Sequence, residues 1–209
     1  MSNIIKIIEI LKKEYPDCRC SLNFNSPFEI TIAVMLSAQC TDDRVNKTTP
    51  ELFKYYGTPK KLANADNEEI ERIIHPCGFY KNKTKNAILC SKMIVEEYDG
   101  IGPDNMQDLM RLPGIGRKSA NVIMLEAFKR PQGIAVDTHV KRISNRIGLS
   151  ENSDPEKIEQ DLLKIIPKKY YYDVNHLLVW HGRKTCSARN PNCETCAINK
   201  YCKKYKVGG

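Results

Sequence analysis

The sequence has no run of about 20 consecutive apolar residues, the length that a membrane-spanning helix requires. It also has no low-complexity segment, no internal repeat and no hairpin turn between two alternating apolar segments. Residues 1–13 carry interspersed charges, and their apolar residues recur at helical spacing: Ile4, Ile7, Ile8 and Leu11. This pattern predicts an amphipathic helix rather than a signal peptide, so we expect a globular, cytoplasmic protein without a membrane segment.

The charge of the chain favours nucleic acid as a partner, and its cysteine content argues against a disulfide-bonded protein. The 209 residues include 33 Lys and Arg against 25 Asp and Glu, a net charge of +8 that favours contact with a polyanion such as nucleic acid. Nine cysteines, an odd number, in a chain without a secretory signal argue against a disulfide framework. Four of them lie within residues 186–202. The others show no metal spacing and are predicted to be buried thiols: Cys18, Cys20, Cys40, Cys77 and Cys90.

Helix signals cover almost the whole chain. Residues 26–29 (SPFE) form a capping box with proline at the first helical position, and further starts occur at Thr41 or Asp42, at residues 66–69 and at residues 153–156. In the absence of strand signals, these segments predict an all-α protein of about ten helices. The break at residues 130–133 (RPQG) is typical of a crossing between two domains.

Residues 80–98 are predicted to form one of the longer helices. Its buried side is expected to carry Ala87, Ile88, Ile94, Val95 and Tyr98. Residues 175–180 are apolar and are compatible with another helix.

Residues 112–118 (LPGIGRK) form a turn with two glycines that leads directly into a helix. The apolar stripe of that helix follows at helical spacing: Ala120, Ile123, Met124, Ala127 and Phe128. Gly114 and Gly116 tolerate positive φ and close backbone approach, so the turn can present N–H groups to an anion such as a DNA phosphate. Residues 105–111 are also predicted helical, which gives a helix–hairpin–helix over residues 105–128. An ordinary connection between two helices is the alternative.

Lys118 lies in the first turn of that helix. The positive helix end there, together with partial desolvation by Val122 and Leu125, is expected to lower its pKa. A partly neutral lysine is the nucleophile that Schiff-base chemistry requires. The alternative is a solvated lysine that contacts phosphate through its charge alone.

Asp137 ends a short apolar segment, residues 133–136 (GIAV), and precedes a new helix that begins with Val140, Ile143 and Ile147. Either Asp137 or Thr138 is the expected N-cap of that helix. Asp137 is also a candidate catalytic carboxylate that stabilises positive charge developing on a sugar. The two roles are compatible, because helix N–H groups would keep the acid ionised.

Four cysteines follow the spacing C-x6-C-x2-C-x5-C: Cys186, Cys193, Cys196 and Cys202. Four thiolates within 17 residues can ligate either zinc or a [4Fe–4S] cluster. Zinc ribbons usually contain two C-x2-C pairs with a longer spacer, whereas this chain has one such pair and tight, asymmetric loops. The spacing therefore favours an iron–sulphur cluster over structural zinc.

Several motifs occur together in one order: SPFEITIAVMLSAQCTD (26–42), GFYKNKTKNA (78–87), LPGIGRK (112–118), VDTHV (136–140), HGRKTC (181–186) and the cysteine spacing of residues 186–202. With these motifs the chain resembles the endonuclease III branch of the helix–hairpin–helix DNA glycosylases. Each motif is moderately specific, and their joint order and spacing are highly specific. The resemblance covers nearly the whole chain.

The resemblance implies a two-lobed, all-helical fold. Residues 21–130 would form a six-helix lobe with the hairpin. Residues 1–20 and 131–209 would form the other lobe, which holds a [4Fe–4S] cluster on the four cysteines of the loop 186–202. DNA would lie, kinked, across the cleft between the lobes with the damaged nucleotide flipped out.

The resemblance also assigns roles to individual residues. Lys118 matches the Schiff-base lysine and Asp137 the catalytic aspartate. Gln39 matches the residue that fills the vacated base stack, and Phe79 occupies the position of the wedge that enters the duplex. The alternatives are a polar helix C-terminal cap for Gln39 and a core aromatic residue for Phe79.

Two positions depart from the family pattern. The wedge is commonly Leu, and Phe79 would stack more and alter the preference for the opposite base. The loop before Cys193 contains Arg189, but Asn190 and Asn192 stand where relatives often carry bases, so its phosphate contacts are expected to be weaker.

The function that the resemblance implies is that of a monomeric base-excision-repair DNA glycosylase and AP lyase in the nucleoid of a bacterium or archaeon. It would remove oxidised pyrimidines of the thymine-glycol type from double-stranded DNA and cleave abasic sites on the 3′ side by β-elimination. The adenine mismatch glycosylase of this family is an alternative, although it lacks the lysine and bears an additional C-terminal domain. A non-catalytic iron–sulphur DNA-binding or redox protein and a zinc-bearing structural module are the others.

Overall fold

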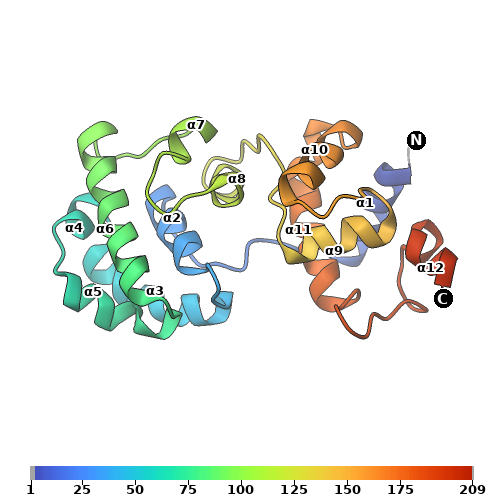
Figure 1. The fold of residues 1–209 in the computed structure, drawn as a ribbon, viewed down its shortest axis with the longest axis horizontal. Coiled ribbons are helices and arrows are strands. Elements are labelled where there is room, and N and C mark those ends of the chain that lie inside the picture. Colours follow the sequence, from blue (N-terminus) through green and yellow to red (C-terminus); the bar gives the residue numbers. More distant parts are fainter. Residues whose placement is uncertain (1–2, 209) are drawn as a thin grey trace. The chain divides into compact units, whose positions relative to one another are not determined.

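The computed structural model describes residues 3–208, with side chains for residues 3–205. Across residues 3–208 every regular element is a helix and no strand is present, as the sequence predicts (Figure 1). The chain divides into two compact units. The continuous unit is Cys20–Arg130, and the discontinuous unit combines Met1–Arg19 with Pro131–Gly209. Within the described residues, no helix has both the length and the apolar character needed to cross a bilayer.

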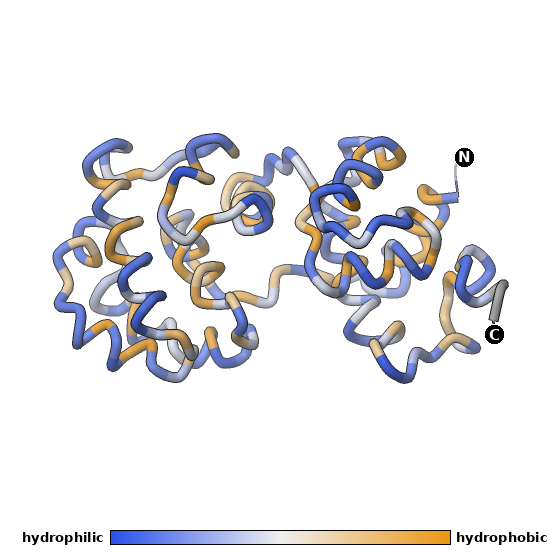
Figure 2. The backbone as a smooth tube through the Cα atoms, viewed as in Figure 1, coloured by the Kyte–Doolittle hydropathy of each residue, from blue (hydrophilic) through white to orange (hydrophobic). Residues whose placement is uncertain are grey.

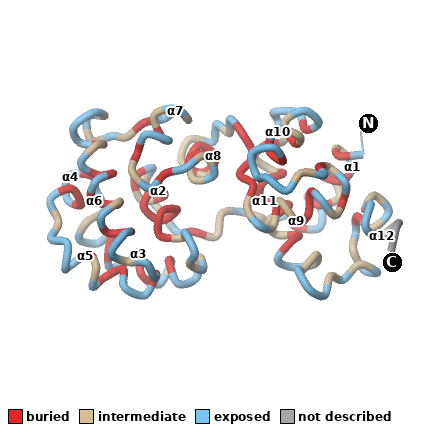
Figure 3. The backbone as a smooth tube through the Cα atoms, in the orientation of Figure 1, coloured by how far each residue is buried: buried red, intermediate tan, exposed pale blue. Residues whose placement is uncertain are grey.

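The continuous unit is built around α2 (Pro27–Leu36). Eight of its ten residues are buried, and it packs against α8, α3 and α6 (Figures 2 and 3). The other helices of this unit are α3 (Asp42–Tyr56), α4 (Pro59–Ala63), α5 (Asn67–Ile74), η1 (His75–Cys77), α6 (Tyr80–Glu97), α7 (Met106–Leu109) and α8 (Arg117–Glu126). A helix that is apolar on nearly all sides must lie in the interior, and this explains the central position of α2.

The predicted capping box begins α2 with one difference. The Ser26 hydroxyl accepts a hydrogen bond from the Glu29 N–H at 3.1 Å, as expected. The Glu29 carboxylate accepts from the Asn25 N–H at 2.6 Å instead of from the Ser26 N–H. The return bond of the box is therefore displaced by one residue, and it still satisfies a backbone donor before the helix.

The prediction for α6 is correct for most of its buried side and wrong for Val95. Ala87, Ile88 and Ile94 are buried, whereas Val95 is 37% exposed. Val95 lies two turns after the buried Ile88 on the same side of α6, so the helical period does not explain its exposure, which depends on what packs against the last turns of the helix.

The discontinuous unit joins the N-terminal helix to the C-terminal part of the chain. The apolar face predicted for residues 1–13 is buried in α1 (Asn3–Glu14), which packs against α11. The remaining helices are α9 (Thr138–Ile147), α10 (Pro155–Ile165), η2 (Lys168–Tyr170), α11 (Tyr171–Lys184), η3 (Asn199–Tyr201) and α12 (Lys203–Gly208). The N-terminal helix thus completes the core of a unit most of whose residues follow position 130.

Candidate functional site

The hairpin of the continuous unit consists of α7, a turn over residues 110–116 and α8. Its first helix is shorter than predicted, because α7 ends at Leu109. Leu109, Leu112 and Ile115 are all buried, and the Ile115 N–H donates to the Leu112 carbonyl at 3.0 Å. These apolar residues fix the turn on the core of the unit.

The two glycines of this turn differ in conformation. Gly114 has a φ of 81°, and a Cβ at this position would lie 3.1 Å from Asn86 Cβ and 3.3 Å from Met35 Cε. Gly116 has an extended backbone, and a Cβ there would meet no atom within 4 Å. Of the two glycines that could tolerate positive φ, only Gly114 adopts it.

Lys118 lies in the first turn of α8. Gly116 is the N-cap and offers no side chain to the N–H groups of that turn, which leaves an end of positive character that attracts anions. The Lys118 side chain is exposed, Val122 is half-buried against the core cluster, and Leu125 is buried. Val122 and Leu125 follow Lys118 at i+4 and i+7, on the same side of α8, and within this unit they leave its side chain exposed.

Gln39 and Phe79 lie in loops of the continuous unit and share an uncommon backbone conformation. Their φ angles are 51° and 48°, in the left-handed region. A side chain larger than glycine is strained there, at a cost of about 1–3 kcal/mol, and such residues gather at functional positions. Phe79 is 66% exposed, so the core alternative is wrong. Gln39 is exposed and lies beyond Ser37, the C-cap of α2, so the cap alternative is wrong as well.

Asp137 is the N-cap of α9 in the discontinuous unit, as predicted. Its Oδ1 accepts hydrogen bonds from the N–H groups of His139 at 2.8 Å and Val140 at 2.7 Å. The residue is half-buried. One carboxylate oxygen thus binds the helix end, and this contact fixes the position of the side chain.

The segment before Asp137 is held by buried side chains. The Ile134 N–H donates to Glu159 Oε1 at 3.2 Å, and the Ala135 N–H donates to Asn175 Oδ1 at 2.8 Å. Glu159 is 2% exposed and Asn175 is 6% exposed. Two buried polar groups therefore replace the strand partner that this extended segment lacks, and they anchor the backbone that delivers Asp137.

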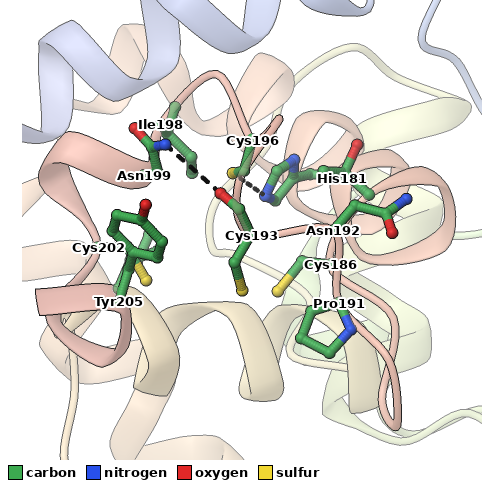
Figure 4. A pocket seen from close by; sticks show the side chains of 12 residues that line it. His181, Cys186, Pro191, Asn192, Cys193, Cys196, Ile198, Asn199, Cys202 and Tyr205 are labelled. Carbon is green, nitrogen blue, oxygen red and sulfur yellow. Dashed lines mark hydrogen bonds between the residues drawn. The ribbon is translucent and has the colours of Figure 1, made fainter. Parts of the chain in front are cut away.

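All four C-terminal cysteines line one pocket in the discontinuous unit. Figure 4 shows the side chains of Cys186, Cys193, Cys196 and Cys202 around it. His181, Tyr205 and Ile198 are among the other lining residues. The four thiols predicted from spacing alone are thus brought together in space.

Two residues that are not among the four cysteines contact the cysteine sulphur atoms. Arg146 donates from Nη1 to Cys186 Sγ at 3.2 Å and to the Ser187 carbonyl at 2.6 Å. His181 Nε2 lies 3.7 Å from Cys196 Sγ (Figure 4). The sequence patterns did not indicate Arg146, because it lies 40 positions before Cys186. His181 could have been found, since it opens the HGRKTC motif.

The protonation of His181 follows from its surroundings. Burial lowers the pKa of its imidazole to about 4, so the ring is neutral at pH 7. The Tyr15 hydroxyl lies 3.1 Å from Nδ1 and 2.7 Å from the Thr185 hydroxyl. If Thr185 donates to Tyr15 and Tyr15 donates to Nδ1, the single imidazole proton remains on Nε2 and faces the sulphur.

The donor set fits an iron–sulphur cluster. Four thiolates are the usual ligands of a [4Fe–4S] cluster, and donors such as Arg146 and His181 hydrogen-bond its sulphurs. Among the described residues, no group of three or more His, Cys, Asp or Glu side chains is placed to hold one metal ion.

Arg189 lies in the loop between Cys186 and Cys193 and is exposed. The Arg146 guanidinium holds this loop through the Ala188 carbonyl at 2.7 Å. Arg189 is thus presented to solvent by a loop that is fixed at its base.

The remaining cysteines follow the buried-thiol prediction only in part. Cys77 and Cys90 are buried, whereas Cys18, Cys20 and Cys40 are half-buried, so the prediction is wrong for these three. Loops and helix ends leave them partly open to solvent. Desolvation raises the pKa of both Cys20 and Cys90 to about 12, which keeps these thiols protonated and unreactive.

Comparison with known proteins adds independent findings. Residues 32–168 match the HhH-GPD superfamily of base excision DNA repair proteins. Endonuclease III of Synechocystis sp. is 47% identical over 197 residues, which cover 94% of this chain and 90% of the relative. Endonuclease III of Escherichia coli is 40% identical over 198 residues, which cover 95% and 93%. A solved complex of Endonuclease III with DNA, non-covalent, has 40% identity and a TM-score of 0.92, covering 99% of this chain and 97% of that chain.

The two hairpin glycines are expected to respond differently to alanine. Gly114→Ala should lower the free energy of unfolding by more than about 1 kcal/mol, because alanine would adopt a positive φ and crowd Asn86. Gly116→Ala is the matched control and should change it by less than about 0.5 kcal/mol. Urea unfolding followed by circular dichroism measures both. Equal losses in the two variants would contradict the geometry of the turn.

Proposed function

The chain belongs to the HhH-GPD superfamily of base excision DNA repair proteins, and we propose that it excises oxidised pyrimidines of the thymine-glycol type through Lys118. With Endonuclease III relatives over almost its whole length, it is a DNA glycosylase and AP lyase that acts on damaged DNA. The non-catalytic DNA-binding alternative is therefore excluded.

The observation that carries the proposal is the place of Lys118 in the hairpin. The N–H groups at the start of α8 receive no cap from Gly116, and the exposed amine belongs to the same helical turn. A DNA phosphate bound at this helix end, against Gly114 and Gly116, would bring the sugar of the adjacent nucleotide within reach of the amine. Bound DNA would also exclude water from the Lys118 amine, which is exposed in the unit without DNA.

In the proposed reaction, the neutral Nζ of Lys118 attacks C1′ of the damaged nucleotide. The C1′–N bond breaks with its electron pair going to the base, which takes a proton from water as it leaves. Opening of the sugar ring gives an imine between Nζ and C1′. Loss of a C2′ proton then breaks the C3′–O bond, which cleaves the strand on the 3′ side of the lesion.

Asp137 is proposed to act on the same nucleotide. Its carboxylate would stabilise the positive charge that develops at C1′ and accept the proton that Nζ loses. The cap bonds to His139 and Val140 hold it through Oδ1, which leaves Oδ2 for this role.

Gln39 and Phe79 are proposed to act on the duplex. Phe79 would insert as an apolar wedge, and Gln39 would fill the space that the flipped nucleotide leaves. Both side chains are exposed on strained loops, a state that solvent alone does not favour for an aromatic residue. Arg189 would contact the phosphate backbone, more weakly than a loop with several basic residues.

We propose that Cys186, Cys193, Cys196 and Cys202 hold a [4Fe–4S] cluster. When bound, the cluster would crosslink the C-terminal loop. The loop would then present Arg189 to DNA, and Arg146 and His181 would donate hydrogen bonds to the sulphurs of the cysteine ligands.

The lysine assignment is tested by borohydride trapping on abasic and thymine-glycol duplexes. Lys118→Ala should yield no covalent adduct and cleave the strand more than about 10³-fold more slowly, because the nucleophile is gone. Lys118→Arg is the matched control: it keeps the positive charge but should form no adduct. If Lys118→Arg cleaved DNA like the unaltered enzyme, the role of Lys118 would be electrostatic. Excision from an adenine-mismatch duplex but not from thymine glycol would favour the other glycosylase type.

The aspartate assignment is tested by Asp137→Asn. Asparagine is as good an N-cap as aspartate, so the free energy of unfolding should change by less than about 0.5 kcal/mol. Base excision should fall by about 10²-fold or more, because the charge that stabilises the sugar cation is lost. Single-turnover excision and thermal unfolding measure the two effects. Loss of stability with unchanged excision would leave Asp137 with the capping role only.

The cofactor assignment predicts about four iron and four sulphide per chain in anaerobically purified protein. Cys193→Ser should lose the visible absorbance of the cluster, whereas Cys90→Ser, at a buried thiol of the continuous unit, should keep it. One zinc per chain and no sulphide would support the zinc-bearing alternative.

A further inference from the structure

Lys83 is a buried lysine in the continuous unit that the proposed reaction does not use. It lies in the first turn of α6 and is 5% exposed. Its Nζ donates to the Leu36 carbonyl at 2.8 Å and to the Cys77 carbonyl at 2.8 Å. Burial lowers the pKa of its ammonium group, and the two carbonyl oxygens offset part of the cost of burying that charge.

Both acceptors are the last carbonyls of helices. Leu36 ends α2, and Cys77 ends η1. The final carbonyls of a helix have no partner within it, and a positive group is favourable at that end. One amine therefore caps two helices, and α6 packs against both of them.

Each capped carbonyl directly precedes a loop with a strained, exposed residue. Gln39 follows Leu36 by three positions, and Phe79 follows Cys77 by two. Both have positive φ. A strained backbone persists only where surrounding contacts hold it, and the Lys83 amine hydrogen-bonds the base of both loops. A hydrogen bond between the side chains of Cys77 and Cys40, the neighbour of Gln39, also joins the two loops.

We propose that Lys83 is a positioning residue that holds the Gln39 and Phe79 loops together for insertion into the DNA duplex. This inference rests on the proposed roles of Gln39 and Phe79. Lys83 does not touch the reacting atoms, and it acts by fixing where two loops from different parts of the chain stand relative to one another within one unit. A displacement of about 1 Å in residues that position a substrate can lower the reaction rate about 100-fold.

The test is a double-mutant cycle on full-length enzyme. Lys83→Met removes both hydrogen bonds at similar side-chain volume, and the partner variant is Gln39→Ala with Phe79→Ala. Single-turnover excision is measured on a thymine-glycol duplex that carries 2-aminopurine opposite the lesion, so that fluorescence reports insertion. Lys92→Met, at an exposed lysine of the same helix, is the control.

Lys83→Met should slow both the fluorescence change and excision by about 10- to 100-fold, with Lys92→Met unchanged. In the background that lacks Gln39 and Phe79, Lys83→Met should cause no more than about a twofold further loss. A merely structural lysine would cause the same loss in both backgrounds, and that result would overturn the inference alone. If the Gln39 and Phe79 variant excised normally, the proposed insertion roles would fail, and the positioning role with them.

Lys83→Gln serves if Lys83→Met does not fold. Glutamine keeps an N–H donor, but its side chain is one bond shorter and cannot reach both carbonyls. The same cycle should again be strongly non-additive. Full excision activity in Lys83→Gln, or additive losses, would overturn the positioning role.

Discussion

A helix satisfies its backbone hydrogen bonds internally except at its ends, where about four N–H and four C=O groups need other partners. The described elements of this chain are all helices, so the backbone groups free to bind a side chain or a ligand lie mainly at helix ends. The start of α8 has no side-chain cap, the start of α9 is capped by Asp137, and the ends of α2 and η1 share Lys83. Apart from Arg189, the residues proposed to bind and cleave DNA are those that occupy or border these helix ends.

The two kinds of end have opposite consequences. An uncapped N-terminus retains its affinity for an anion, and the hairpin keeps it accessible by placing glycine where a capping side chain would stand. A capped N-terminus instead fixes a carboxylate, because Asp137 binds two N–H groups of α9 through one oxygen. The same backbone feature is thus the proposed DNA-binding site at the start of α8, and at the start of α9 it fixes the position of the carboxylate that we propose to be catalytic.

Support for the cysteine pocket comes from residues that the spacing of the cysteines does not include. Arg146 binds both a sulphur and the loop carbonyls, and His181 is held neutral by burial beside Cys196. Both are presented by helices, α9 and α11, which pack against each other. The pocket therefore depends on the core of its unit and not only on the loop that carries the thiols.

The sequence by itself determined the helical segments, the hairpin, the cap at Asp137 and the four cysteines, because each depends on spacing within a few residues. Its motifs also pointed to the family that the comparison with known proteins identifies. Only the tertiary structure decided that Lys118 stays exposed although the buried Leu125 lies on its side of α8, and that Val95 is exposed. The partners of Lys83 and Arg146, and the strain at Phe79, likewise depend on contacts between segments far apart in the chain. Local periodicity fixes which side of a helix is apolar, but packing between helices decides which polar group is buried and what it binds.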